Sequence, residues 1–176
     1  PTLTHYHWRS NNGSEATASS ATNGVEDSVL PSLQKSTTTR LRIQVSNEGG
    51  STTPSIPYRL EYAQKVSTCA AASGWTDVGA AGGDFDMSNS ANLTDGADTT
   101  NIAATTGGVT DENTTFLTPN AGVKDTSSET AGITLTDSEF VELEYSFLAS
   151  STASENATYC FRVTNAGIPI DAYPLY

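Results

Sequence analysis

Positive charge is scarce in this sequence. Eight Lys and Arg residues stand against twenty Asp and Glu residues, which gives a formal net charge of −12. Nucleic acids and anionic membrane surfaces bind to basic faces of proteins, so we expect neither of them as a partner. Acidity combined with many hydroxyl groups is typical of a protein that stays soluble while exposed at a surface.

Long apolar runs are also missing. No stretch of about eighteen apolar residues occurs, so no segment is expected to span a membrane. The chain begins with Pro1 rather than Met and has no visible signal peptide, which we interpret as a mature chain whose leader has been removed. These features predict an extracellular location at the cell surface.

Cysteine is limited to Cys69 and Cys160. An even number of cysteines in a chain of extracellular character predicts one disulfide, and the alternative is two buried thiols in a cytosolic protein. The disulfide would close a loop of about 90 residues and contribute roughly 4–5 kcal/mol in the chain-entropy model.

Histidine is equally rare, and this limits the chemistry that the chain can perform. Only His5 and His7 are available to a Ser-His-Asp arrangement, and a Gly-x-Ser-x-Gly elbow is absent, so we do not expect an enzyme. The two histidines lie two residues apart on one strand face, a spacing found in some metal sites. Two polar residues on a half-exposed strand are the simpler interpretation, and we predict no metal and no cofactor.

Helical periodicity is absent, whereas alternation of apolar and polar residues is frequent. The sequence therefore predicts an all-β fold, a single antiparallel β-sandwich of jelly-roll or Ig-like type with long polar loops. We expect residues 37–46 and 57–64 to pair as an antiparallel unit. Strands are expected at residues 3–9, 37–46, 57–64, 132–136, 139–148 and 157–165.

The same alternation assigns side chains to the two faces of each strand. In residues 3–9, it places Leu3 on the face of the two histidines and Tyr6 and Trp8 on the opposite face. In residues 37–46, it directs Arg40, Arg42 and Gln44 to solvent. Glu142 and Glu144 share one face of residues 139–148, which we interpret as a solvated face rather than a catalytic carboxylate pair.

The remaining segments are less regular. Residues 66–130 are too long for one loop of a compact domain and are expected to hold several short strands. Residues 168–176 contain two prolines, which predicts an edge strand or a docked tail. We divide the chain into residues 1–23, an N-terminal strand with a flexible segment, and residues 24–176, the β-sandwich domain.

Polar loops offer two further kinds of site. Asp84, Asp86 and the acidic stretches at 95–98 and 111–113 could supply oxygen ligands for calcium, but solvated acidic loops are the commoner interpretation. Exposed aromatic residues that could bind carbohydrate are Trp75 and the terminal tyrosines, for which core packing is the default. Sequons, which would carry covalent glycans if the host glycosylates the protein, occur at Asn12, Asn92, Asn113 and Asn156.

Five segments together resemble a known group of sequences. The chain resembles β-rich domains of secreted surface proteins, mostly of uncultured prokaryotes, and the resemblance spans nearly the whole chain. It implies a fold and a location, not a biochemical activity. The segments that carry it are residues 4–9, 13–16, 40–49, 58–63 and 157–167.

The architecture is also similar to that of donor-strand extracellular filaments, which are pilus-like. Their subunits insert a terminal strand into the incomplete sheet of a neighbour, where backbone hydrogen bonds and side-chain pockets act together. We therefore expect a structural subunit that self-associates into a head-to-tail polymer. Residues 3–9 would be the donor strand, with Leu3, Tyr6 and Trp8 as anchors. The alternative is a monomeric cell-surface adhesin or carbohydrate-binding module.

Overall fold

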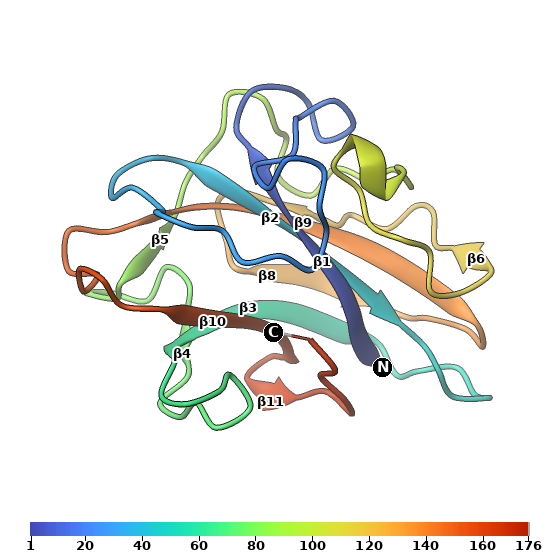
Figure 1. Cartoon of the computed structure of the whole chain (residues 1–176). Helices are drawn as coiled ribbons and strands as arrows, with labels where there is room; N and C mark the ends of the chain where they lie inside the picture. The colour runs from blue at the N-terminus through green and yellow to red at the C-terminus, as the bar shows by residue number, and fades with distance from the viewer. Residues whose placement is uncertain (176) are drawn as a thin grey trace.

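The computed structural model describes residues 1–175 as two β-sheets packed face to face (Figure 1). The predicted all-β sandwich is confirmed. The only helical element among these residues is a short 3₁₀ turn, η1 (Ala104–Thr106). No helix in this part of the chain has the length and apolar character needed to cross a bilayer.

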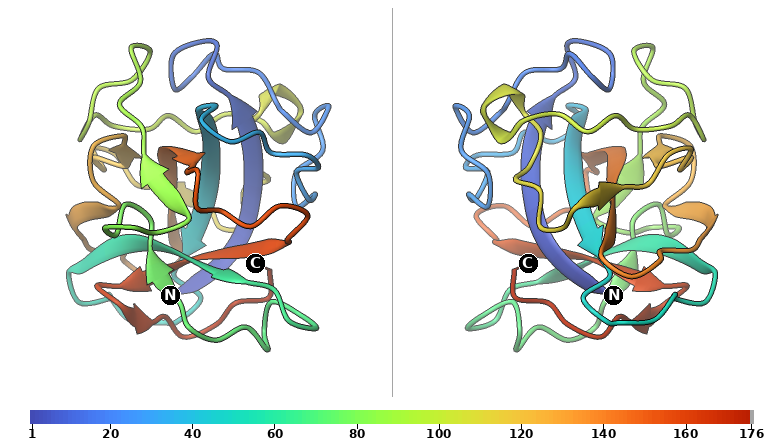
Figure 2. Two further views of the ribbon diagram at one scale, coloured as in Figure 1. Left: turned by 90° about the vertical axis from the view of Figure 1, so that its left-hand side faces the viewer. Right: turned by 90° about the vertical axis from the view of Figure 1, so that its right-hand side faces the viewer.

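The first sheet, sheet A, has the order β1-β2-β9-β5, and its first three strands pair antiparallel. The short strands β6 and β7 pair in parallel with β9 beside β5. β1 lies at one edge of the sheet, side by side with β2 (Figure 2). The bounds are β1 (Thr2–Ser10), β2 (Thr39–Ser46), β5 (Phe85–Met87), β6 (Thr115–Phe116), β7 (Val123–Lys124) and β9 (Glu139–Ala149).

The second sheet, sheet B, has the order β11-β10-β3-β4, and β8 also pairs with β3. Residues 37–46 and 57–64 thus lie in opposite sheets, and their predicted pairing is wrong. Each strand has one apolar face, and placing the strands across the core from each other covers both faces. The bounds are β3 (Ile56–Gln64), β4 (Thr76–Asp77), β8 (Glu129–Ile133), β10 (Tyr159–Asn165) and β11 (Ile168–Pro169).

The core lies between β2 and β9 of sheet A and β3 and β10 of sheet B, which are the strands with the clearest alternation. Their inward side chains are almost inaccessible to solvent, and the hydroxyl of Tyr145 donates a 3.0 Å hydrogen bond across the core to the carbonyl of Tyr58. The principal core side chains are Leu41, Ile43, Val45, Tyr58, Leu60, Val141, Leu143, Phe147 and Val163.

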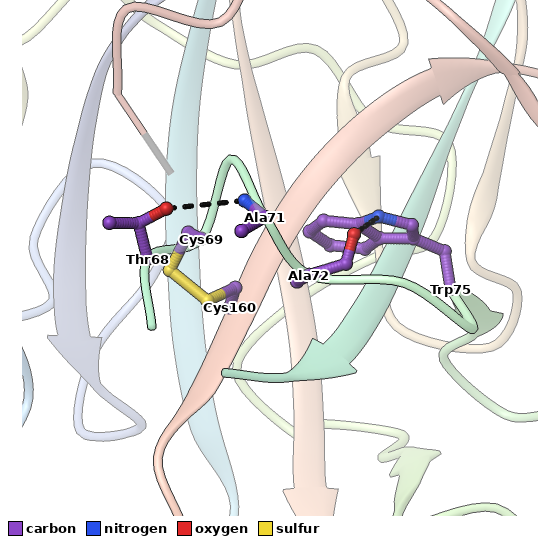
Figure 3. The surroundings of a disulfide bond; sticks show 6 residues. All are labelled: Thr68, Cys69, Ala71, Ala72, Trp75 and Cys160. Carbon is purple, nitrogen blue, oxygen red and sulfur yellow. Dashed lines mark hydrogen bonds between the residues drawn. A yellow bond between two sulfur atoms is a disulfide. The ribbon is translucent and has the colours of Figure 1, made fainter. Parts of the chain in front are cut away.

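The predicted disulfide is confirmed. Cys69 and Cys160 are bonded, with 5.5 Å between their Cα atoms and a sequence separation of 91 residues (Figure 3). The bond ties the loop before β4 to β10. In the same loop, Trp75 donates a 3.2 Å hydrogen bond to the Ala72 carbonyl, and the guanidinium of Arg162 lies 4.1 Å from the Trp75 ring centre. This aromatic ring is therefore engaged by the fold.

Residues 66–130 contain several short strands separated by long loops, as predicted. The C-terminal stretch places β11 at the edge of sheet B and then docks along β1, where the Leu3 amide donates a 3.1 Å hydrogen bond to the Ala172 carbonyl. This agrees with the prediction of an edge strand or docked tail, except that Tyr176 lies outside the described residues.

Candidate functional site

An apolar cleft of about 760 Å³ opens on the side of the sandwich where β1 of sheet A and β10 of sheet B form the two edges. Aromatic side chains from both sheets line it, namely Tyr6 and Trp8 on β1 and Tyr159 and Phe161 on β10. Trp8 and Phe161 pack edge to face, with 5.4 Å between their ring centres. The cleft is thus an opening into the hydrophobic core.

A β-bulge in β1 determines which side chains face this cleft. The register with β2 shifts between Leu3 and His5, so Thr4 is the extra residue. As a result, Leu3 lies on the core side together with Tyr6 and Trp8, rather than on the side of the histidines as strict alternation predicted. Leu3 and Trp8 are buried and Tyr6 is half-buried, so all three expected anchors contact the core of their own chain.

The mouth of the cleft is partly covered by residues 29–35. Leu30 and Leu33 of this segment pack against the core, while Val29 is 70% exposed. Three exposed charged residues, Lys35, Lys65 and Glu155, also line the cleft. The mouth therefore combines apolar surface with charged side chains of both signs.

No strand formed by residues 1–175 pairs with the edge of β10 beside the cleft. The Lys65 amide donates to the Thr158 carbonyl, so Thr158 hydrogen-bonds toward β3. Because the direction of the backbone groups alternates along an antiparallel strand, those of Tyr159 and Phe161 point away from β3. β11 pairs only with Thr164 and Asn165, at the far end of β10. Within residues 1–175, the N–H and C=O groups of Tyr159 and Phe161 thus face an open edge.

The outer edge of β1, in contrast, is covered by the segment that follows it. Backbone amides of Ala21 and Asp27 donate 2.8 Å hydrogen bonds to the carbonyls of Trp8 and Tyr6, and the Asp27 carboxylate accepts from the Tyr6 amide. Residues 1–27 therefore form one hydrogen-bonded unit. Its donation to a neighbouring subunit stays a prediction.

The two histidines lie in different environments and do not share a site. The side chain of His7 is buried, with Nδ1 2.6 Å from the Gly108 carbonyl and Nε2 2.8 Å from the Ser20 hydroxyl, and burial lowers its pKa. His5 is half-buried among three carboxylates. Burial lowers the pKa of His5, but the hydrogen bond and charge of Asp27, helped by Glu26 and Glu112, outweigh it and raise this pKa.

The outer face of sheet A carries a cluster of buried charges, which we call the Arg–Glu cluster. Glu144 accepts hydrogen bonds from Arg9, from Arg40 at 3.3 Å and from Arg42 at 2.8 Å. Arg42 also binds Glu142, and all five side chains are fully buried. The prediction that Arg40, Arg42, Gln44, Glu142 and Glu144 face solvent is therefore wrong.

Long loops cover this face of the sheet and supply further partners to the Arg–Glu cluster. Arg40 donates 2.6 Å and 2.8 Å hydrogen bonds to the Asn11 side chain and the Gly13 carbonyl, and Arg9 donates to the Ala18 carbonyl at 2.9 Å. Glu15 lies 3.2 Å from Arg42. Buried charges are tolerated when each is paired and hydrogen-bonded in this way.

Two buried atoms of the Arg–Glu cluster, Arg9 Nε and Glu142 Oε1, have no hydrogen-bond partner among the described residues. Burial raises the pKa of Glu142 to about 7, against the opposing effect of Arg42. The protonated form of Glu142 stabilises the folded state. This contribution is complete below the ordinary pKa of 4.5 and is lost as the pH rises through about 7.

We therefore expect Glu142→Gln to reduce the loss of unfolding free energy that wild-type protein shows between about pH 5 and pH 8. Gln does not titrate, so the difference in unfolding free energy between variant and wild type reports on this one carboxyl group. We expect its contribution to the loss in the wild type to be on the order of a few kcal/mol at most. Urea denaturation across the range measures it, with Glu155→Gln, an exposed site, as the control. Parallel curves for wild type and Glu142→Gln would contradict the assignment.

The acidic loops are stabilised by contacts within the chain. Asp95 accepts hydrogen bonds from Lys124 at 2.7 Å and from the Asp125 amide at 3.0 Å, and Asp98 accepts 2.8 Å hydrogen bonds from the amides of Asn120 and Ala121. Backbone hydrogen bonds to its ionised form lower the pKa of Asp98. These carboxylates thus hold loops together through contacts within the chain.

The sequons differ in accessibility. Asn12, Asn92 and Asn156 are exposed, whereas Asn113 is half-buried. The amide nitrogen of Asn113 donates to the Ser46 hydroxyl at 2.7 Å and to Glu48 at 3.1 Å. The amide nitrogens of Asn12 and Asn92 also donate hydrogen bonds, at 2.8 Å and 3.3 Å, so it is their exposure that makes the first three positions the better acceptors.

Sequence reasoning missed the cleft and the Arg–Glu cluster. One sequence signal could have indicated the cluster. Arg42 and Glu144 both lie on the polar face of a strand with regular apolar–polar alternation, and the structure pairs these two residues directly. The cleft had no such signal, since it depends on how two sheet edges meet.

Comparison with family models, with curated proteins and with solved structures finds no match to this chain.

Proposed function

We propose that this chain is a structural subunit of an extracellular filament, in which neighbouring copies exchange the N-terminal unit formed by residues 1–27. The observation that carries the proposal is the position of β1. It is a terminal strand at a sheet edge, and its inner face borders the cleft instead of being fully packed against sheet B. Such a strand can be replaced by the same strand of another copy.

Exchange requires no new surface complementarity, because each contact within the monomer is re-formed between copies. The unit would carry Leu3, Tyr6 and Trp8 into the neighbour's core and Arg9 into the neighbour's Arg–Glu cluster. Head-to-tail exchange is heterologous, so it need not close on itself and can propagate a fibre. The disulfide and the low content of basic residues support an extracellular setting.

The hinge for this exchange is the segment 28–34, which crosses the mouth of the cleft. The segment begins after Asp27, the last residue that hydrogen-bonds to β1. It ends before Lys35, which forms a β-bridge with Ala149. Ser32 has a φ angle of 58°, a left-handed conformation that costs a non-glycine residue roughly 1–2 kcal/mol. Extension would release this strain, and the segment would then span at most about 25 Å.

The test is to lock β1 to its own β2. Ser10 of β1 is paired directly with Thr39 of β2, and the Ser10 amide points away from β2. The two residues are therefore a non-hydrogen-bonded pair, whose short Cα separation suits a disulfide. We expect the wild type to form fibres, and the oxidised Ser10→Cys/Thr39→Cys variant to remain monomeric. Light scattering coupled to size exclusion and negative-stain electron microscopy measure this, with Ser10→Ala/Thr39→Ala as the matched control.

Two outcomes would reject the proposal. Fibres formed by the locked variant would show that β1 is not the strand that is donated. A wild type that remains monomeric at high concentration would reject the filament itself.

A second candidate function is a monomeric adhesive module, and the open edge of β10 favours it. Backbone groups of Tyr159 and Phe161 could pair with an extended peptide of a partner, whose apolar side chains would enter the cleft. In this case β1 stays in its own sheet. A sharp monomer peak for the wild type, together with protection of the β10 edge amides by added partner, would support the module.

A further inference from the structure

His5, Glu26 and Asp27 form a cluster of metal-binding groups beside β1, and neither proposed function uses it. One ligand atom from each residue lies within 4.8 Å of the others. His5 Nδ1 is 2.7 Å from Asp27 Oδ2 and 3.8 Å from Glu26 Oε2. The side chains are 20–23% exposed, so solvent and ions can reach the cluster.

Both ring nitrogens of His5 face carboxylates. On the side opposite Asp27, Nε2 lies 3.2 Å from Glu112 Oε2. A neutral imidazole carries only one N–H. If Nε2 donates that proton to Glu112, the lone pair of Nδ1 points at the oxygens of Asp27 and Glu26. A positive charge, either a second proton or a metal ion, must then lie on this side of the ring.

We propose that His5, Glu26 and Asp27 bind a divalent transition-metal ion of the zinc class through Nδ1 and two carboxylate oxygens. Zinc bonds of about 2.0–2.1 Å at tetrahedral angles place ligand atoms roughly 3.3 Å apart, a value between the two separations of Nδ1 from the carboxylates. Two carboxylates balance the charge of the ion. Water completes the coordination, since the cluster is partly exposed.

The groups around the cluster orient its ligands in the way that metal sites require. With a metal ion on Nδ1, the Nε2 proton of His5 would be donated to Glu112, 3.2 Å away, which is the usual role of a carboxylate behind a metal-bound histidine. Asp27 Oδ1 accepts from the Tyr6 amide at 2.8 Å, and Glu26 Oε2 accepts from the Thr110 amide at 2.7 Å. Each side chain is thereby held with an oxygen near the His5 ring.

Zinc binding to metal-free protein tests the proposal. We expect isothermal titration with zinc chloride to show one equivalent bound, and zinc to raise the melting temperature by roughly 5–10 °C at a hundredfold excess over Kd. His5→Gln and Asp27→Asn should each lose at least tenfold in affinity. Glu112→Gln should lose roughly 10–100-fold through misorientation of the ring. The matched control is Asp86→Asn, an exposed carboxylate outside the cluster.

Nuclear magnetic resonance separates metal binding from a simple ion pair, because the chain has only two histidines. Zinc should shift the Nδ1 signal of His5 and leave the signals of buried His7 unchanged, which also shows that each variant is folded. Absence of stoichiometric binding, or binding that survives both His5→Gln and Asp27→Asn, would overturn the proposal. All three ligands lie within residues 1–27, so they stay together whether or not this unit is exchanged between copies.

Discussion

Replacing Glu144 with alanine should destabilise the protein by roughly 3–5 kcal/mol, because it leaves the guanidinium groups of Arg9, Arg40 and Arg42 buried without their shared carboxylate. The desolvation cost of these charges remains while their compensation is lost. In a chain of this length, such a loss lowers the melting temperature by roughly 6–20 °C. Differential scanning calorimetry measures the change.

The controls for Glu144→Ala distinguish buried charge from loss of a side chain. Glu155→Ala removes an exposed carboxylate and should alter stability by less than about 0.5 kcal/mol. Glu144→Gln keeps the shape and part of the hydrogen bonding, so its effect should fall between the two. Equal stability of Glu144→Ala and Glu155→Ala would mean that the cluster contributes nothing as a unit.

Removing the disulfide in Cys69→Ala/Cys160→Ala should cost roughly 4–5 kcal/mol, since the bond closes a loop of 91 residues and restricts the unfolded chain. The loop before β4 should also loosen, because Cys69 is its covalent link to β10. Urea denaturation measures the free energy, and reduced wild-type protein provides the comparison. A loss below about 1 kcal/mol would indicate that the unfolded chain is already compact.

The strands themselves were predictable from the sequence, because alternation reports directly on whether a strand has one apolar face. Leu41, Ile43 and Val45 of β2, and Val141, Leu143 and Phe147 of β9, point to the core as expected. The pairing of strands was not predictable in the same way. Strands β2 and β3 have equivalent patterns, and nothing local decides whether they pair in one sheet or face each other across the core.

The candidate site was less predictable than the fold, for two physical reasons. The cleft and the placement of Leu3 depend on the bulge at Thr4, and one inserted residue reverses the faces that follow it. The burial of Arg40 and Arg42 depends on loops that lack any periodic pattern. Alternation identifies a polar face, but only the covering loops decide whether that face contacts water or other protein groups.

Burial of the Arg–Glu cluster removes three basic side chains from the surface that a second copy would contact. With the other buried charges, Lys124, Glu61 and Asp125, four of the eight basic residues and four of the twenty acidic residues are buried, which leaves four basic against sixteen acidic groups at the surface. Two copies that approach each other therefore meet a mainly repulsive far field. At physiological ionic strength this field decays over a Debye length of about 8 Å. The ionic strength of the medium thus sets the distance over which two copies repel each other before their surfaces touch.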